Sequence, residues 1–214
     1  MQILKKKTNK KLIPELPISQ FKGRIITIST PGEVEMAVNY LLKFPVLGLD
    51  TETRPQFGKG GKRNKVALLQ VSTYDTCFLF RLNLIGFPLA LCRLLEDERI
   101  PKIGLSLHDD FMAMHARSKF TPRNYVELQK LIKEFGVEDQ SLAKIYANLF
   151  HERISKAQQL SNWEAEILTD KQKIYAATDA WACIRIYEHL EYLRSTHDYI
   201  VEDDEENLSE EGQG

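Results

Sequence analysis

Two carboxylates, Asp50 and Glu52, stand at the end of the apolar segment VLGLDTET (residues 46–53), with one residue between them. A short apolar run of this kind is typical of a strand buried on both faces. Side chains two positions apart project from the same face of a strand, so we expect the two acids side by side. Like charges ~4 Å apart repel by ~4 kcal/mol at an effective dielectric constant of ~20. The pair therefore either lies in open solvent or needs a partner that offsets this repulsion.

Tyr175 and Asp179 form a second candidate pair, in the segment KIYAATDAWACIRIYEHL. The pattern of this segment is helical, and a spacing of four places the two side chains on one face of the helix, one turn apart. Apolar neighbours such as Ile174 and Ile184 indicate a core-facing helix, in which Tyr175 is either a core tyrosine with a solvated hydroxyl or part of a site. The small residues around Asp179 leave room for another element to approach closely.

A third acidic segment, KIGLSLHDDFMAMHA, contains the doublet Asp109 and Asp110. Ser106, three residues before Asp109, predicts a capping box at the start of a helix. This assigns Asp109 to the helix end and leaves Asp110 free to point elsewhere. His108 has no other His or Cys near it at metal-ligand spacing, so we do not count it as a ligand or a base.

The composition limits the class of protein. A chain of 214 residues suits one domain with a full hydrophobic core. The net charge of −1 neither favours nor excludes nucleic acid, because the distribution of charge matters more than the sum. Three cysteines that are far apart and lack metal spacing predict buried thiols in a reducing compartment. Without an apolar stretch of ~18 residues or a signal peptide, we expect a cytoplasmic protein that does not contact membranes.

Charge is uneven along the chain and divides it into three parts. The segment KKKTNKK makes residues 1–21 a basic N-terminal segment. The segment EDDEENLSEEGQG gives residues 198–214 the character of an acidic tail, which we expect to be disordered. Residues 22–197 have neither internal repeats nor a linker and are expected to form one domain.

Between the two ends, hydrophobic patterns predict a mixed α/β sheet with helices on both faces. Antiparallel strands come first, around a hairpin at 74–75, and a parallel strand follows a helix. From about Val126 the pattern becomes almost wholly helical. The expected strands span 24–30, 46–50, 66–73, 76–82 and 101–106, and the expected helices span 31–44, 87–97, 108–118 and 170–195.

The segments LDTET, KIGLSLHDD and YAATDA occur in the order of the three exonuclease motifs of the DEDDy 3′–5′ exonucleases. Over about residues 24–195 the chain resembles this family, which includes ribonuclease D and the exonuclease domain of the Werner syndrome helicase. The likeness extends to KVALLQVST and LSNWEAEILTDKQKIYAATDA. It implies a ribonuclease H-like fold, with a mixed β-sheet flanked by helices and a helical C-terminal half.

The resemblance also implies a set of catalytic residues. Asp110 is chosen over Asp109 because it stands six positions after Gly104, as in the family pattern. The tyrosine in YAATD separates this chain from the branch of the family that has histidine in that role. The implied metal-binding acids are Asp50, Glu52, Asp110 and Asp179, and the implied water-orienting residue is Tyr175.

Phosphodiester hydrolysis by two divalent cations, Mg²⁺ or Mn²⁺, needs hard oxygen ligands such as these carboxylates. We expect Asp50 to bridge both cations, and Glu52 and Asp179 to hold the cation that carries the attacking water. Asp110 would support the second cation, directly or through water. Tyr175 would orient the water rather than deprotonate it, because a tyrosine pKa near ~10 makes a poor base at neutral pH. A cation between Asp50 and Glu52 would also offset their repulsion.

The stretch RPQFGKGGKRNK (residues 54–65) is rich in cations and contains no acid. It is either a solvated, mobile loop or a flexible phosphate clamp whose glycines permit close backbone approach. Phe57 either pins this loop to the body of the protein or stacks on a base. The candidate contacts to nucleic acid are Thr51, Phe57, Lys59, Lys62, Arg63 and Lys65.

We therefore expect a metal-dependent 3′–5′ exonuclease that hydrolyses phosphodiester bonds from the 3′ end of DNA or RNA. Its partner would be a single-stranded or 3′-ended nucleic acid, without an obligate protein partner. One alternative is a nucleic-acid-binding module with a decayed exonuclease site, although every expected acid is present. Another is a structural α/β interaction domain that binds no nucleic acid. The choice between RNA and DNA depends on contacts to the 2′-OH, which no sequence pattern marks.

Overall fold

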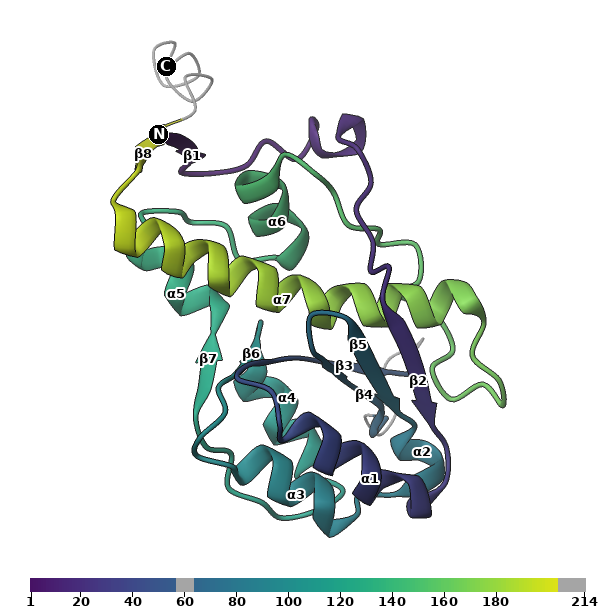
Figure 1. Cartoon of the computed structure of the whole chain (residues 1–214). Helices are drawn as coiled ribbons and strands as arrows, with labels where there is room; N and C mark the ends of the chain where they lie inside the picture. The colour runs from purple at the N-terminus through teal and green to yellow at the C-terminus, as the bar shows by residue number, and fades with distance from the viewer. Residues whose placement is uncertain (57–63, 204–214) are drawn as a thin grey trace.

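The computed structural model describes residues 1–56 and 64–203, and a six-stranded sheet forms its centre (Figure 1). In spatial order its strands are β2 (Arg24–Ile28), β5 (Thr76–Phe80), β4 (Val66–Ser72), β3 (Leu47–Thr53), β6 (Lys102–Gly104) and β7 (Tyr125–Glu127). β4 pairs antiparallel with β3 and with β5, whereas the other three pairs are parallel. The predicted mixed α/β sheet is confirmed.

Helices cover both faces of this sheet (Figure 1). They are α1 (Pro31–Leu41), α2 (Leu82–Ile85), α3 (Leu89–Glu96), α4 (Leu107–Met114), α5 (Leu128–Glu134), α6 (Leu142–Phe150) and α7 (Asp170–Thr196), with a 3-10 turn η1 (Ile13–Glu15) near the N-terminus. α1, α3 and α4 share one apolar cluster with the sheet, while α7 crosses the opposite face and contacts α5 and α6. In the described part of the chain, no helix is both long and apolar enough to cross a membrane.

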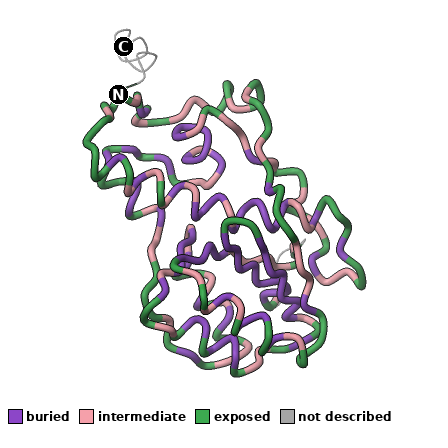
Figure 2. Tube along the Cα trace, in the orientation of Figure 1, coloured by how far each residue is buried: buried purple, intermediate pink, exposed green. Residues whose placement is uncertain are grey.

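The central strands carry apolar side chains on both faces. On β4, Leu69 and Val71 pack in the cluster of α1, α3 and α4, whereas Leu68 packs against α7. All three side chains are fully buried, and buried residues gather in the sheet and in the helix surfaces that cover it (Figure 2). Burial on both faces explains why these strands read as continuous apolar runs in the sequence.

α7 approaches β3 closely at Gly48. A Cβ atom at this position would lie 1.9 Å from the carbonyl oxygen of Ala180, so no larger residue fits without displacing the helix. Ala176, Ala177 and Ala180 of α7 are fully buried. The small residues therefore allow the close approach that the sequence predicts, and they bring the middle of α7 next to β3.

The start of α7 is fixed by a capping box. The Thr169 N–H donates to Gln172 Oε1 at 2.9 Å, and the Gln172 N–H donates to Thr169 Oγ1 at 3.2 Å. From this start the helix runs for 27 residues, which confirms the helix expected over 170–195. Tyr175 and Asp179 are both buried on it, one turn apart.

The two described ends of the chain pair with each other, although we expected disorder from residue 198 onward. β1 (Gln2–Lys5) pairs in parallel with β8 (Tyr199–Glu202), and Leu4 is fully buried. Lys5 Nζ and Glu202 Oε2 lie 2.9 Å apart and form an ion pair. Disorder from residue 198 onward was therefore a wrong prediction for β8. Pairing between segments at opposite ends of a chain leaves no local pattern to read.

Two other predictions of strands and helices are corrected. Helical structure was expected from about Val126, but this residue lies in β7, whose three residues are too few to show a period. β2 was expected in the antiparallel part of the sheet but pairs in parallel with β5. The hairpin at 74–75 is confirmed, because β4 and β5 pair antiparallel on either side of it.

Candidate active site

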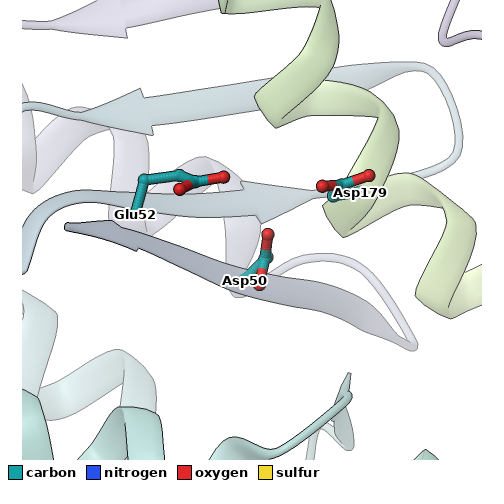
Figure 3. A group of neighbouring side chains, drawn as sticks. All are labelled: Asp50, Glu52 and Asp179. Carbon is teal, nitrogen blue, oxygen red and sulfur yellow. The ribbon is translucent and has the colours of Figure 1, made fainter. Parts of the chain in front are cut away.

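Three carboxylates meet at the end of β3. Oxygens of Asp50, Glu52 and Asp179 all lie within 4.8 Å of one another, and the side chains point into a shared space (Figure 3). Asp50 and Glu52 come from alternate positions of β3, and Asp179 comes from α7. The prediction that the two acids of β3 share a face is confirmed, and that face is the one that α7 covers.

β3 becomes irregular just beyond these acids. Asp50 pairs with Gln70 of β4, and the register shifts between Glu52 and Thr53. Such an irregularity bends a strand and changes the direction of its side chains. Asp50 and Glu52 are partly buried, and only 7% of Asp179 is exposed. The carboxylates therefore lie where the core meets the solvent.

Asp110 approaches the same place from the other layer of the fold, in the first turn of α4. The Thr51 hydroxyl donates a hydrogen bond of 2.6 Å to Asp110 Oδ1. The charge of Asp110 also helps to raise the pKa values of Asp50 and Glu52, whereas Asp109 is exposed. The geometry thus favours Asp110 over Asp109 as the fourth acid. A contact between Thr51 and nucleic acid stays a prediction.

The capping box predicted between Ser106 and Asp109 is wrong. The N–H groups of Ser106 and Leu107 each donate to a carboxylate oxygen of Glu127 at 2.8 Å. Ser106 itself adopts a left-handed conformation with φ of 63°, and its side chain caps nothing. Glu127 lies on β7, far away in the sequence, so a local motif could not reveal it. This contact ties the first turn of α4 to β7 and so helps to position Asp110.

Burial makes the acids of the cluster hold their protons tightly. Burial, followed by the charges of Asp179 and Asp110, raises the pKa of Glu52 to about 9. Burial also raises the pKa of Asp110 and the pKa of Asp179 to about 7. The pKa of Asp50 lies well above its ordinary value because of burial and then the charge of Asp179. Asp50, Glu52 and Asp179, so close together and with the charge of Asp110 acting on the first two, cannot all ionise without a counter-charge.

This set of side chains fits hard divalent cations. Mg²⁺ prefers oxygen ligands, binds through a few carboxylates and keeps several of its waters. Asp50, Glu52 and Asp179 present their oxygens at a spacing that one ion can bridge. A bound cation would also provide the counter-charge that the raised pKa values call for.

Tyr175 precedes Asp179 by one turn of α7. It is 8% exposed, and its ring packs on the fully buried Trp163 with ring centroids 6.0 Å apart. Burial, followed by the charge of Asp179, raises the pKa of Tyr175 far above its ordinary value. At neutral pH the hydroxyl therefore keeps its proton, so it can donate a hydrogen bond but cannot act as a base. Trp163 itself packs inside the protein.

A cavity of about 250 Å³ lies over the carboxylates. Among the described residues that line it, Lys156 is the one cation, and its charge lowers the pKa of Asp179. Sequence reasoning missed Lys156, because it stands in an irregular segment with no motif spacing. The cluster of acids is the signal that could have found it, since a cavity with so much negative charge favours a nearby lysine.

Residues 25–193 match the family described as 3′–5′ exonuclease. This chain belongs to the 3′–5′ exonuclease family. Exonuclease 3′–5′ domain-containing protein 2 of Drosophila melanogaster is 35% identical over 156 residues, which cover 71% of this chain and 26% of the relative. The bifunctional 3′–5′ exonuclease/ATP-dependent helicase WRN of Mus musculus is 33% identical over 170 residues, covering 76% of this chain and 12% of the relative. The exonuclease domain described here thus spans about a quarter or less of these two relatives.

Solved structures confirm the ribonuclease H-like fold of this exonuclease domain. The Aedes aegypti Nibbler EXO domain superposes with a TM-score of 0.76 at 18% identity, covering 90% of this chain and 98% of that one. Escherichia coli RNase D superposes with a TM-score of 0.70 at 19% identity, covering 82% of this chain and 47% of that one. At these identities the likeness concerns the fold.

The basic loop of the exonuclease domain is only partly described. Phe57, Lys59, Lys62 and Arg63 lie outside the described residues, so their contacts to nucleic acid stay predictions. Lys65 is described and exposed. Arg54 forms an ion pair of 3.3 Å with Glu164, which joins the end of β3 to the segment before α7. Arg54 therefore has a partner within the protein.

Proposed function

We propose that this exonuclease domain hydrolyses phosphodiester bonds from the 3′ end of a nucleic-acid strand, with divalent cations held by its carboxylates. The observation that carries the proposal is the convergence of Asp50, Glu52 and Asp179 within 4.8 Å in a cavity that also contains Tyr175. Membership of the 3′–5′ exonuclease family supports the direction of hydrolysis.

The carboxylates would hold two cations, Mg²⁺ or Mn²⁺. Asp50, with an oxygen within 4.8 Å of those of Glu52 and Asp179, would contact both ions, while Asp110 would complete the second site from α4. Bound there, the cations would supply an activated water and neutralise the negative charge that builds up on the phosphate. The hydrogen bond from Thr51 holds Asp110 in one orientation, which favours a site that is ready before substrate arrives.

Tyr175 would orient the attacking water. Its hydroxyl stays protonated because its pKa is raised, and it lies one turn from Asp179 on the same face of α7. Packing against Trp163 restricts the ring, so the direction of the hydroxyl is fixed by the fold. The side chain therefore contributes position rather than proton removal.

Lys156 would stabilise the phosphate during the reaction. Its charge already acts on Asp179, so the ammonium group lies within electrostatic reach of the place where the scissile phosphate would bind. A fixed positive charge in a partly closed cavity stabilises a developing negative charge more strongly than water does. Lys156 is thus a candidate catalytic residue beyond the family motifs.

The substrate is proposed only as a strand with a free 3′ end. Structures are known of Trypanosoma brucei RNase D in complex with RNA U12 and of Brucella melitensis NrnC bound to pGG. These support a nucleic-acid substrate without deciding between RNA and DNA. Cys77, Cys92 and Cys183 are buried and unpaired, which supports a reducing compartment such as the cytoplasm.

The proposal is tested with single-stranded RNA and DNA of one sequence, labelled at the 5′ end, in Mg²⁺, Mn²⁺ or EDTA. We expect a ladder of products that shortens from the 3′ end and depends on the cation. Asp50→Asn should abolish the ladder, whereas Glu35→Gln, on the exposed surface of α1, should leave it unchanged. Binding of both strands without any shortening would contradict the proposal and support a decayed site.

A further inference from the structure

An open groove lies beside the catalytic cavity, at the carboxyl ends of β6 and β7. We call it the α5 groove; it has a volume of about 500 Å³ and is lined by Ser106, Glu127, Gln129, Lys130, Lys133 and Gln140, with other residues at its rim. Neither the acidic motifs nor the proposed chemistry uses its lysines.

The α5 groove continues the catalytic cavity. Leu105 and Ser141 line the cavity, and their chain neighbours Ser106 and Gln140 line the groove. β3, β6 and β7 are parallel neighbours, so their carboxyl ends lie at one edge of the sheet. The register places the end of β7 level with Leu49, next to Asp50, and with ~4.8 Å between adjacent strands it lies ~10 Å across the sheet from there. A strand leaving the carboxylates along this edge would enter the groove directly.

The catalytic cavity alone is too small for a strand. Its volume of about 250 Å³ lies below the ~300–1,000 Å³ typical of pockets for drug-sized ligands. It therefore suits the terminal nucleotide and the scissile phosphate, and the rest of the strand must lie outside it. The α5 groove is twice as large and open to solvent, which suits a flexible backbone.

The charge of the groove suits phosphates. Lys130 and Lys133 are exposed and lie one turn apart on α5, and in the described part of the chain neither forms an ion pair. Glu127 faces the groove, but its carboxylate accepts the N–H groups at the start of α4, which offset its charge. The exposed Asp109 is the remaining acid at the rim.

We propose that the α5 groove binds the nucleic-acid strand upstream of its 3′ end, with Lys130 and Lys133 contacting successive backbone phosphates. The inference rests on the proposed function, since it assumes that the 3′ end lies at the carboxylates. The contact is to the backbone, so it carries no base preference. It makes affinity depend on strand length, because a dinucleotide fills the cavity without reaching the lysines.

The test removes both charges in the full chain and measures binding. Lys130→Gln/Lys133→Gln is compared with Lys43→Gln/Lys119→Gln, a matched pair of exposed lysines that precede β3 and β7 and so lie at the amino ends of these strands. All proteins also carry Asp50→Asn to prevent hydrolysis. Affinity is measured for a dinucleotide and a dodecanucleotide over a range of salt concentrations.

For single strands, each phosphate contact contributes ~0.7 to the slope of log affinity against log salt. Removing Lys130 and Lys133 should therefore reduce the slope for the dodecanucleotide by about 1.4 and leave the dinucleotide unchanged. The control pair should leave both strands unchanged. An unchanged slope for the dodecanucleotide, equal effects on both strands, or no binding by the parent protein would each overturn the proposal.

The same proteins separate this inference from the proposed function. Suppose that the protein with Asp50 shortens strands but that removal of the two lysines leaves the slope unchanged. The proposed exonuclease activity would then stand, and the role proposed for the α5 groove would be wrong. If the slope changes but the protein with Asp50 never shortens a strand, the α5 groove would bind nucleic acid and the proposed exonuclease activity would be wrong. The two failures are therefore distinguishable.

Discussion

The two faces of the central sheet are made by the same strands and are both apolar over much of their area, but the α7 face also carries buried polar groups. Towards α1, α3 and α4, β3 and β4 present Leu49, Leu69 and Val71, which are buried in one apolar cluster. Towards α7, alternate positions of these strands present Asp50 and Gln70, and the amide of Gln70 is fully buried with no hydrogen-bond partner among the described residues. Both faces gain free energy from the burial of apolar side chains, but only the α7 face keeps these polar groups buried at a cost.

This difference indicates which parts of the sheet contribute to stability and which contribute to activity. Buried acids with raised pKa values destabilise the cation-free fold, because protons or cations must offset their repulsion. The apolar clusters on the two faces must therefore offset the cost of these buried acids. If this comparison is right, replacing an acid on the α7 face should lower activity without lowering stability. Truncating an apolar residue on the opposite face should lower stability without lowering activity.

Asp179→Asn should give the largest effect. Loss of a carboxylate from the cation site removes several kcal/mol of transition-state stabilisation, so we expect a rate lower by ~10³-fold or more. The same change removes a buried charge, so in EDTA at pH 8 the variant should be more stable than the parent by about 2 kcal/mol. Single-turnover hydrolysis and urea denaturation measure the two effects. A variant that loses both activity and stability would contradict the comparison.

Leu69→Ala should show the reverse pattern on the apolar face. Leu69 is fully buried, and truncation of such a residue costs about 2–5 kcal/mol of unfolding free energy. The rate per folded molecule should stay within about twofold of the parent, since the acids come from the other face. Urea denaturation, combined with active-site titration of the folded fraction, checks this. If the rate per folded molecule falls more than tenfold, packing on this face also affects activity, which would contradict the comparison.

Tyr175→Phe should have a smaller effect on the rate. It removes the hydroxyl and keeps the ring that packs on Trp163, so the fold should survive. Loss of an orienting hydrogen bond should slow hydrolysis by ~10²-fold, within the usual range for such groups. The affinity for the strand should be unchanged. Equal rates for parent and variant would remove Tyr175 from the mechanism.

The pH dependence of stability should show the smallest effect. The folded-state pKa values of Asp110 and Asp179, about 7, lie above the unfolded value near 3.8. The folded state therefore binds more protons between pH 4 and pH 7, and the unfolding free energy of the cation-free protein falls as pH rises through this window. At pH 4–5 the parent and Asp179→Asn should be nearly equally stable, and by pH 8 the parent should melt several degrees lower. A difference in melting temperature between the two proteins that stays the same at every pH would show that the charge of Asp179 does not destabilise the folded state.

The sequence alone predicted the strands and helices whose side chains repeat with a regular local period. The spacing of Asp50 and Glu52 on a strand, and of Tyr175 and Asp179 on a helix, follows from two fixed geometries, and the structure has both. The resemblance then implied that the two pairs converge. The local periodicity of the sequence does not show which distant residue completes each contact.

Apart from β7, which is too short to show a period, the errors involve such distant partners. Ser106 looked like a cap because the true partner of this helix start, Glu127, comes from another strand. β1 and β8 pair across the whole chain, so neither end shows the pattern on its own. Lys156 reaches Asp179 only because an irregular segment folds back over α7. These contacts depend on tertiary structure, and they position the site rather than form the motifs.

The central claim is that Asp50, Glu52, Asp110 and Asp179 converge because they bind divalent cations that catalyse hydrolysis. Crystals of the protein soaked in Mn²⁺, measured by anomalous scattering, test it most directly. We expect strong anomalous peaks within coordination distance of oxygens of Asp50, Glu52 and Asp179 at a Mn²⁺ concentration that supports hydrolysis. Carboxylates without anomalous density at that concentration, in a protein that still shortens strands, would contradict it.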